Sequence, residues 1–223
     1  MRELSKWGLF SVESMNRSNV ALQVISLLGI LFYGGTGGTE PSMASPGLPH
    51  DVYVEGTYRG NQEITFSLSV AQENFVKIFS NGVVILGERE NGEAVYHFID
   101  NDKKLITKVS QRNLYRIGEF RDWDSMVRLI HLRPGTRLVQ EKPSDDKKAC
   151  TLYHVSDEEK IRVCMNDTYH IPVFIEQDGE VVERTTRIEP SASSLDAAGL
   201  LNKYLKEKYR YIDADDDISP DTD

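Results

Sequence analysis

Alternation of apolar and polar residues dominates the chain between Asp51 and Ser110. In six segments, apolar residues recur at every second position, which is the period of a strand with one buried face. These segments are residues 51–59, 64–70, 74–80, 83–89, 93–99 and 104–110. Asn81-Gly82 and Asn91-Gly92 stand between consecutive segments and signal tight hairpin turns. Strands joined so closely predict an antiparallel meander, because parallel neighbours need a long crossover.

The middle of the chain changes to a helical period. Apolar residues there recur at intervals of three and four: Phe120, Trp123, Met126, Val127 and Ile130. Either Asp122 or Asp124 can cap the start of this helix, and Pro134-Gly135 ends it.

The last third of the chain combines strands with a second helix. Residues 136–142 have strand character, and residues 170–190 predict a hairpin that turns at Asp178-Gly179. The segment Ser194–Arg210 predicts an amphipathic helix whose apolar positions are Leu195, Leu200, Leu201, Tyr204, Leu205 and Tyr209. With about ten strands and two helices, the pattern predicts an α+β fold in which one curved antiparallel sheet wraps a helix.

The only two cysteines, Cys150 and Cys164, enclose a strand–turn–strand pattern. In a hairpin centred on Asp157, Tyr153 faces Ile161, Thr151 faces Val163, and the cysteines face each other within reach of a disulfide. The spacing is too long for a zinc pair or a C-x-x-C redox motif. We therefore expect a disulfide, which needs an oxidising compartment; two unrelated reduced thiols are the alternative.

The N-terminal part of the chain predicts export. Val20–Tyr33 is the most apolar run, with the length of a signal-peptide core and short of a spanning helix. Arg17 precedes it, so Met15 is a better start than Met1. We expect cleavage after Ala44 or in the glycine-rich stretch before it, and a periplasmic or secreted protein. An uncleaved membrane anchor is the alternative.

These expectations define the domain organisation. Residues 1–44 are assigned to the signal peptide with a possible extension, 45–50 to a linker, 51–210 to one domain, and 211–223 to an acidic disordered tail. The close carboxylates of that tail are also compatible with a calcium site, but the glycine turn and distal glutamate of an EF-hand loop are missing. The net charge of −9 disfavours nucleic acid as a partner.

No arrangement of residues predicts catalysis. The five histidines, His50, His97, His131, His154 and His170, are scattered, and His97 and His154 are expected on strand surfaces. Hydrolase, metalloprotease and phosphate-loop motifs are missing. We therefore expect a non-enzymatic protein without a cofactor or metal; catalysis by a histidine is the less favoured reading.

The apolar strand faces predict a binding surface instead. Large apolar groups at Phe66, Leu68, Phe75 and Phe79 lie on strand faces that two helices of modest length would not fill. We expect a lipid, an acylated lipoprotein or another apolar ligand in the concave side of the sheet, beneath the C-terminal helix. The predicted ligand-binding residues are Phe66, Leu68, Val76, Ile78, Leu201 and Leu205.

The alternative is an envelope interaction module, which regulates a membrane-associated protein partner and whose concave side is only a core. An open concave face favours ligand binding, and a face filled by the C-terminal helix favours the interaction module.

The order of elements from Val52 to Pro190 resembles the periplasmic lipoprotein-carrier superfamily, with the LolA-like fold. The resemblance lies in three places: Tyr96, Phe98 and Asp100 on one strand, Met165-Asn166-Asp167 before Ile171-Pro172-Val173, and the Asp178-Gly179 hairpin. Ile99 is an extra residue in the first motif. The resemblance implies an unclosed β-barrel covered by helices, with an apolar cavity for acyl chains.

One departure from that family concerns its first helix, which lies across the barrel before the first strand. Only the short segment Ser45–His50 stands between the expected cleavage region and the first strand. The C-terminal helix Ser194–Arg210 would then take the covering role.

Overall fold

A computed structural model describes residues 51–217 except for 61, 91, 117–121, 131–135, 142–149, 157 and 192–194. These described residues belong to one compact unit, residues 32–223. The expected signal peptide, the linker and residues 218–223 lie outside them. Among the residues described, no helix is long and apolar enough to cross a membrane.

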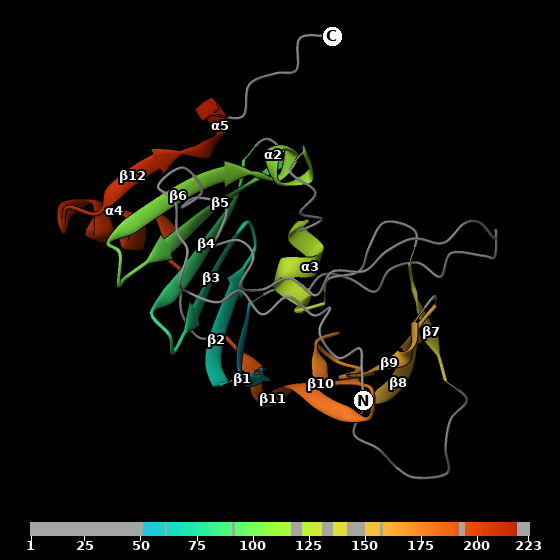
Figure 1. Ribbon diagram of the computed structural model, residues 1–223. Helices are drawn as coiled ribbons and strands as arrows, with labels where there is room; N and C mark the ends of the chain where they lie inside the picture. Colours follow the sequence, from blue (N-terminus) through green and yellow to red (C-terminus); the bar gives the residue numbers. More distant parts are fainter. Residues whose placement is uncertain are drawn as a thin grey trace, which may run out of the picture. The chain divides into compact units, whose positions relative to one another are not determined.

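The described residues form one large, curved, unclosed sheet with a few short helices (Figure 1). Its strands are β1 (Val52–Arg59), β2 (Glu63–Ala71), β3 (Asn74–Phe79), β4 (Val83–Glu90), β5 (Glu93–Asp100), β6 (Leu105–Ser110), β7 (Leu138–Gln140), β8 (Thr151–Val155), β9 (Glu158–Met165), β10 (Pro172–Gln177), β11 (Glu180–Pro190) and β12 (Arg210–Asp213). The helices are α2 (Gln111–Arg116), α3 (Trp123–Arg128), α4 (Ala197–Lys206) and α5 (Ala214–Asp217).

The strand order is β12-β6-β5-β4-β3-β2-β1-β11-β10-β9-β8-β7. Neighbours pair antiparallel except for β12 and β6, which are parallel. The predicted meander is confirmed as β1 to β6, with Gly82 and Gly92 both at φ 83°. Asp178 and Gly179 also have positive φ, as a tight hairpin turn requires. The α+β class is thus confirmed.

The cysteine hairpin forms with a register different from the predicted one. Cys150 and Cys164 are joined by a disulfide, with 5.5 Å between their Cα atoms. However, Cys164 lies opposite Leu152, and Tyr153 lies opposite Val163 rather than Ile161. For residues 151–154 the pairing differs from the predicted register by two residues, and an irregularity between His154 and Val155 separates these pairs from the pair Val155–Glu158. Because the strand period is two, this shift keeps every side chain on its predicted face, and the cysteines meet diagonally.

Replacing both cysteines by serine is expected to lower the free energy of unfolding by about 3 kcal/mol, because the disulfide restricts the unfolded chain across a short loop. Chemical denaturation of wild type and of the double variant Cys150→Ser/Cys164→Ser measures the difference. Thiol titration of the denatured wild-type protein should detect no thiol until reductant is added. Two reactive thiols in protein from an oxidising compartment would contradict the pairing.

The middle helix is shorter than its apolar pattern suggests. Helix α3 begins after Asp122, whose carboxylate accepts a hydrogen bond from the Ser125 backbone N–H at 2.7 Å. It ends at Leu129, which adopts the left-handed conformation at φ 62°. A separate helix, α2, directly follows β6 and was not predicted. Phe120 lies outside the described residues.

The C-terminal segment was predicted incorrectly in part. Helix α4 is shorter than Ser194–Arg210, and its N-cap is Asp196. Residues 211–213 are not a disordered tail, because they belong to β12, which pairs with the edge of β6. The Lys108 ammonium donates to Asp213 at 2.7 Å, and Asp215 accepts from the Ser110 backbone N–H at 2.9 Å and from Asn113 at 2.8 Å. The domain therefore continues to residue 217.

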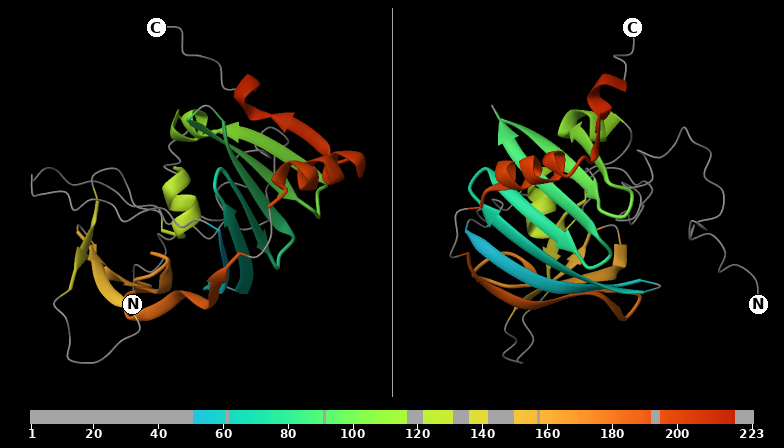
Figure 2. Two further views of the ribbon diagram at one scale, coloured as in Figure 1. Left: turned by 180° about the vertical axis from the view of Figure 1, so that it is seen from behind. Right: turned by 90° about the vertical axis from the view of Figure 1, so that its left-hand side faces the viewer.

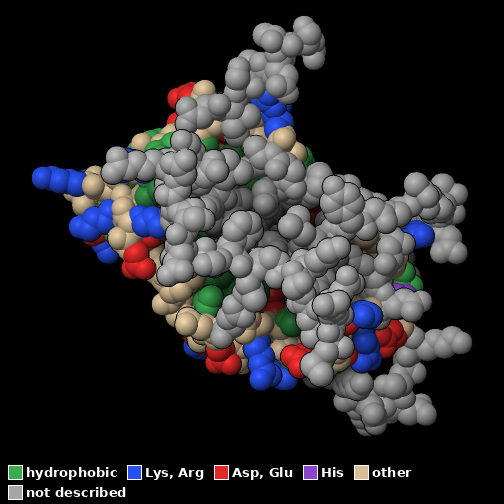
Figure 3. Space-filling view, in the orientation of Figure 1, with side chains coloured by type: hydrophobic (Ala, Val, Ile, Leu, Met, Phe, Trp, Pro, Cys, Tyr) green, Lys and Arg blue, Asp and Glu red, His purple; other side chains and the backbone are tan. Residues whose placement is uncertain are grey.

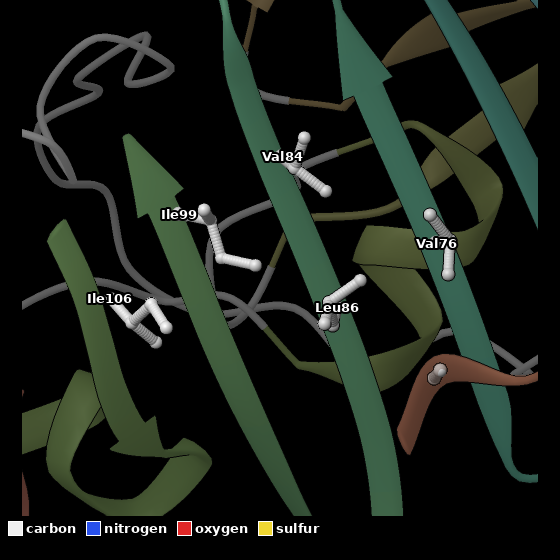
Figure 4. Packing of buried hydrophobic residues seen from close by; sticks show 6 residues of the cluster. Val76, Val84, Leu86, Ile99 and Ile106 are labelled. Carbon is white, nitrogen blue, oxygen red and sulfur yellow. The ribbon is translucent and has the colours of Figure 1, made fainter. Parts of the chain in front are cut away.

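The two helices α3 and α4 pack on opposite faces of the sheet. Figure 2 shows α3 inside the curve of the sheet and α4 outside it. On the face that we call outer, α4 contributes Ala197 to a core with Val76, Val84, Leu86, Ile99 and Ile106 (Figure 4). On the face that we call inner, Trp123 of α3 meets Phe75 edge-on, with 5.2 Å between ring centres.

Candidate functional site

The six predicted ligand-binding residues do not lie together. Phe66 and Leu68 belong to the inner face and are 3% and 0% exposed. Val76 and Ile78 belong to the outer face, which is also the face that α4 covers, so Leu201 and Leu205 lie on that side as well. The predicted position of the C-terminal helix over the inner face is therefore wrong.

The register of the β2–β3 hairpin explains this division. Leu68 lies opposite Lys77, and Phe66 lies opposite Phe79. Opposite residues of an antiparallel pair share a face, so Phe75, Lys77 and Phe79 continue the inner face whereas Val76 and Ile78 turn outward.

Aromatic side chains make up much of the inner face. Phe75 lies 6.2 Å from Tyr96 between ring centres, and Tyr96 lies 6.5 Å from Phe98. The face continues across β1, β11, β10, β9 and β8 through one row of mutually opposite residues: Tyr58, Glu183, Ile175, Val163 and Tyr153. Large apolar groups thus extend across most of the sheet, with a few polar groups among them.

Lys77 is the most unusual of these polar groups. It is a lysine that is only 4% exposed, on a strand between two inward phenylalanines. Its ammonium donates to the Tyr58 hydroxyl at 2.7 Å. It also lies 5.1 to 5.2 Å from the ring centres of Tyr58, Phe66 and Phe79, within cation–π range. The rings replace part of the hydration that the ammonium loses on burial.

Glu183 of β11 is the acidic member of the same cluster. It is 5% exposed, and burial raises its pKa from 4.5 to about 8. Two neighbours oppose that rise: the positive charge of Lys77 and a hydrogen bond from Tyr58. Carboxyl atom Oε1 has no hydrogen-bond partner among the described residues. We call Lys77, Tyr58 and Glu183 the inner polar cluster.

The order of hydrogen bonds indicates the chemistry of this cluster. Tyr58 accepts from Lys77, so its own proton is directed to the Glu183 carboxyl. The oxygen that accepts from Tyr58 cannot also be Oε1, which has no partner. A proton on Oε1 would make this atom a buried donor without an acceptor among the described residues. In that state the inner polar cluster would present a donor to an acceptor oxygen, and the charge of Lys77 would favour an anionic one.

Lys77 and Glu183 were not among the predicted site residues. The sequence did contain a signal for them, namely their positions in the strands. Each alternates in phase with apolar residues that point inward, so its side chain is expected on the buried face. The sequence alone does not show that β1 lies between β2 and β11, which is what brings the two residues to Tyr58.

The histidines remain dispersed. The expectation that His97 lies on a strand surface is wrong: it is 6% exposed on the outer face, its atom Nδ1 has no partner among the described residues, and the Tyr211 ring lies 6.2 Å away. Burial and the nearby Lys108 ammonium lower the pKa of His97 to about 4. His154 is half-buried on β8 and His170 lies in the β9–β10 turn, whereas His50 and His131 lie outside the described residues.

Within the described ranges, no group of three His, Cys, Asp or Glu side chains is placed to hold a metal ion. Comparison of the sequence with known protein families and with curated proteins finds no match.

Proposed function

We propose that this chain is an exported, non-catalytic binding protein that holds an acyl chain or similar apolar ligand on the inner face of its sheet. The observation that carries the proposal is the separation of the two faces. The amphipathic helix α4 covers the outer face, whereas α3, a helix of six residues, packs on the apolar inner face.

The inner polar cluster suggests where the polar end of such a ligand binds. A carboxylate or other acidic group can accept from Oε1 of neutral Glu183 and gain from the Lys77 charge. The alkyl chain would then lie along Leu68 and Phe75. Each methylene removed from water contributes about 0.8 kcal/mol before the costs of binding.

The disulfide supports an oxidising compartment for this activity, as export to a periplasm or to the outside would provide. A LolA-like carrier role for lipids or acylated lipoproteins is the finer form of the proposal. The unclosed curved sheet is compatible with it.

The test compares a fluorescent long-chain fatty acid with the alcohol of equal chain length. Wild type should bind both saturably at neutral pH, and the acid about tenfold more tightly, as a charge-assisted hydrogen bond provides. Leu68→Glu should abolish binding of both, because it places a polar carboxyl group in the path of the alkyl chain on the inner face. Ile78→Glu changes an outer residue that is 45% exposed and should leave binding unchanged.

Lys77→Met separates the two parts of the proposal. Binding of the alcohol should persist, and the preference for the acid should disappear. Circular dichroism verifies that each variant is folded. If folded wild type binds neither probe, the binding function is wrong; if it binds both equally well, only the role of the polar cluster is wrong.

An envelope interaction module is the second candidate. Ile78 on β3 and Leu205 on α4 are 45% and 41% exposed, and both elements contribute to the outer side. Solvent-exposed side chains of this size favour a protein contact when they lie together. Co-purification from cross-linked envelopes, lost in the variant Ile78→Ser/Leu205→Ser, would favour this function.

A further inference from the structure

Basic side chains gather at one end of the domain. We call this the basic end, and it consists of six exposed residues: Lys103, Lys104, Lys203, Lys206, Lys208 and Arg210. Figure 3 shows Lys and Arg side chains clustered at the left of the molecule, where α4 lies in Figure 1.

Hydrogen bonds hold the two segments of the basic end side by side. The Arg210 backbone N–H donates to the Lys104 carbonyl at 2.8 Å. The Tyr209 hydroxyl donates to the Asn101 side chain at 3.0 Å, between the chain after α4 and the β5–β6 turn. The six basic residues, distant in sequence, therefore share one surface.

Acidic groups offset part of this charge, and Asp213, Asp215 and Asp216 follow Tyr211 at the border of the basic end. Asp100 forms an ion pair with Lys103 at 2.8 Å. Of the described residues in the same segments, 101–104 and 203–210, Asp102 and Glu207 are the exposed acids. The surface is therefore locally positive in a chain of net charge −9. Because the Debye length is about 10 Å at 0.1 M salt, this local charge determines what can approach the basic end.

Apolar side chains are exposed beside these charges. Leu205 stands between Lys203 and Lys206 on the solvent side of α4 and is 41% exposed. Tyr211, next to Arg210 on β12, is also 41% exposed. Lysines around an apolar and an aromatic side chain are the composition of a surface that lies at the headgroup level of a bilayer.

We propose that the basic end docks on the surface of a membrane that contains anionic phospholipids. Lys203, Lys206 and their neighbours contact the phosphate groups, and Leu205 and Tyr211 enter the interface. Nucleic acid is the less favourable polyanion, because a longer strand would also meet the acidic remainder of the chain. This docking goes beyond ligand binding and involves the outer side of the domain.

The test measures co-sedimentation of the full chain with two kinds of vesicle: phosphatidylcholine alone, and equal parts of phosphatidylcholine and phosphatidylglycerol. Wild type should bind the anionic vesicles and lose affinity as salt is raised. The double variant Lys203→Gln/Lys206→Gln should bind them roughly thirtyfold more weakly, since each basic residue near a charged membrane contributes about a fivefold factor. Leu205→Ser should weaken binding and keep its salt dependence.

The matched control, Lys160→Gln/Arg184→Gln, removes the same charge from exposed positions on β9 and β11 and should bind like wild type. Equal losses in the control and test variants would show an effect of net charge and overturn the proposal. Binding to both vesicle types without salt dependence would also overturn it, since the apolar run Val20–Tyr33 alone would produce that result. So would a wild-type chain that binds single-stranded DNA but not anionic vesicles.

Discussion

Raising the pH from 4.5 to about 8 should reduce the contribution of Glu183 to the free energy of unfolding by about 5 kcal/mol. The folded protein keeps the Glu183 proton up to a pKa of about 8, whereas the unfolded chain releases it near 4.5. Deprotonation therefore favours the unfolded state increasingly across this window. The stabilisation is complete below 4.5 and is lost as the pH passes about 8.

His97 has the opposite effect over part of the same range. Its pKa is lowered from 6.5 to about 4, so the unfolded chain binds a proton that the folded protein does not. Stability from this residue rises by about 3 kcal/mol between pH 4 and 6.5. The two effects largely offset each other below pH 6.5, and the fall caused by Glu183 should dominate above it.

Denaturant unfolding of wild type and Glu183→Gln isolates the effect of Glu183. The variant, which is neutral at every pH, should match wild type near pH 4.5 and exceed its stability by about 5 kcal/mol above pH 8. Glu180→Gln, at the exposed start of the same strand, is the control and should retain the wild-type pH profile. A constant difference between wild type and Glu183→Gln over this range would contradict the account.

The variant Phe75→Ala should lower the free energy of unfolding by about 4 kcal/mol. Phe75 is fully buried on the inner face and packs against Tyr96 and Trp123. Truncation removes these contacts and leaves a cavity between β3 and α3. Chemical denaturation measures the loss, and a red shift of tryptophan emission should accompany it because Trp123 becomes more exposed.

Ile78→Ala on the same strand is the matched control. Ile78 is 45% exposed on the outer face, so its truncation should change stability by less than about 1 kcal/mol. If both variants lose a similar amount of unfolding free energy, the inner side of β3 is not packed better than its outer side.

The local alternation of apolar and polar residues was sufficient to predict the strands of the meander. Each of β1 to β6 has period-two alternation, and glycine turns such as Asn81-Gly82 force the next strand to return antiparallel. The disulfide followed from the same periodicity, and it tolerated an error of two residues in register because such a shift preserves the faces. These features depend on residues near one another in the chain.

The local pattern of apolar and polar residues did not predict features that depend on contacts between distant segments. The apolar stripe of α4 shows that one side is buried, but it does not indicate which face of the sheet receives it. The acidic composition of residues 211–217 suggested solvation, whereas the free edge of β6 and the Lys108 ammonium order residues 210–213 as β12. Pairing with a distant strand outweighed the composition.

The candidate site shows the same division. Alternation placed Phe66 and Leu68 on a buried face, and the sequence by itself determined that this face is apolar. Only the tertiary structure placed Lys77 and Glu183 at the Tyr58 hydroxyl, because β11 returns beside β1 after more than one hundred residues. Burial of those two ionisable side chains is a property of the assembled sheet, since each strand alone would leave them in water.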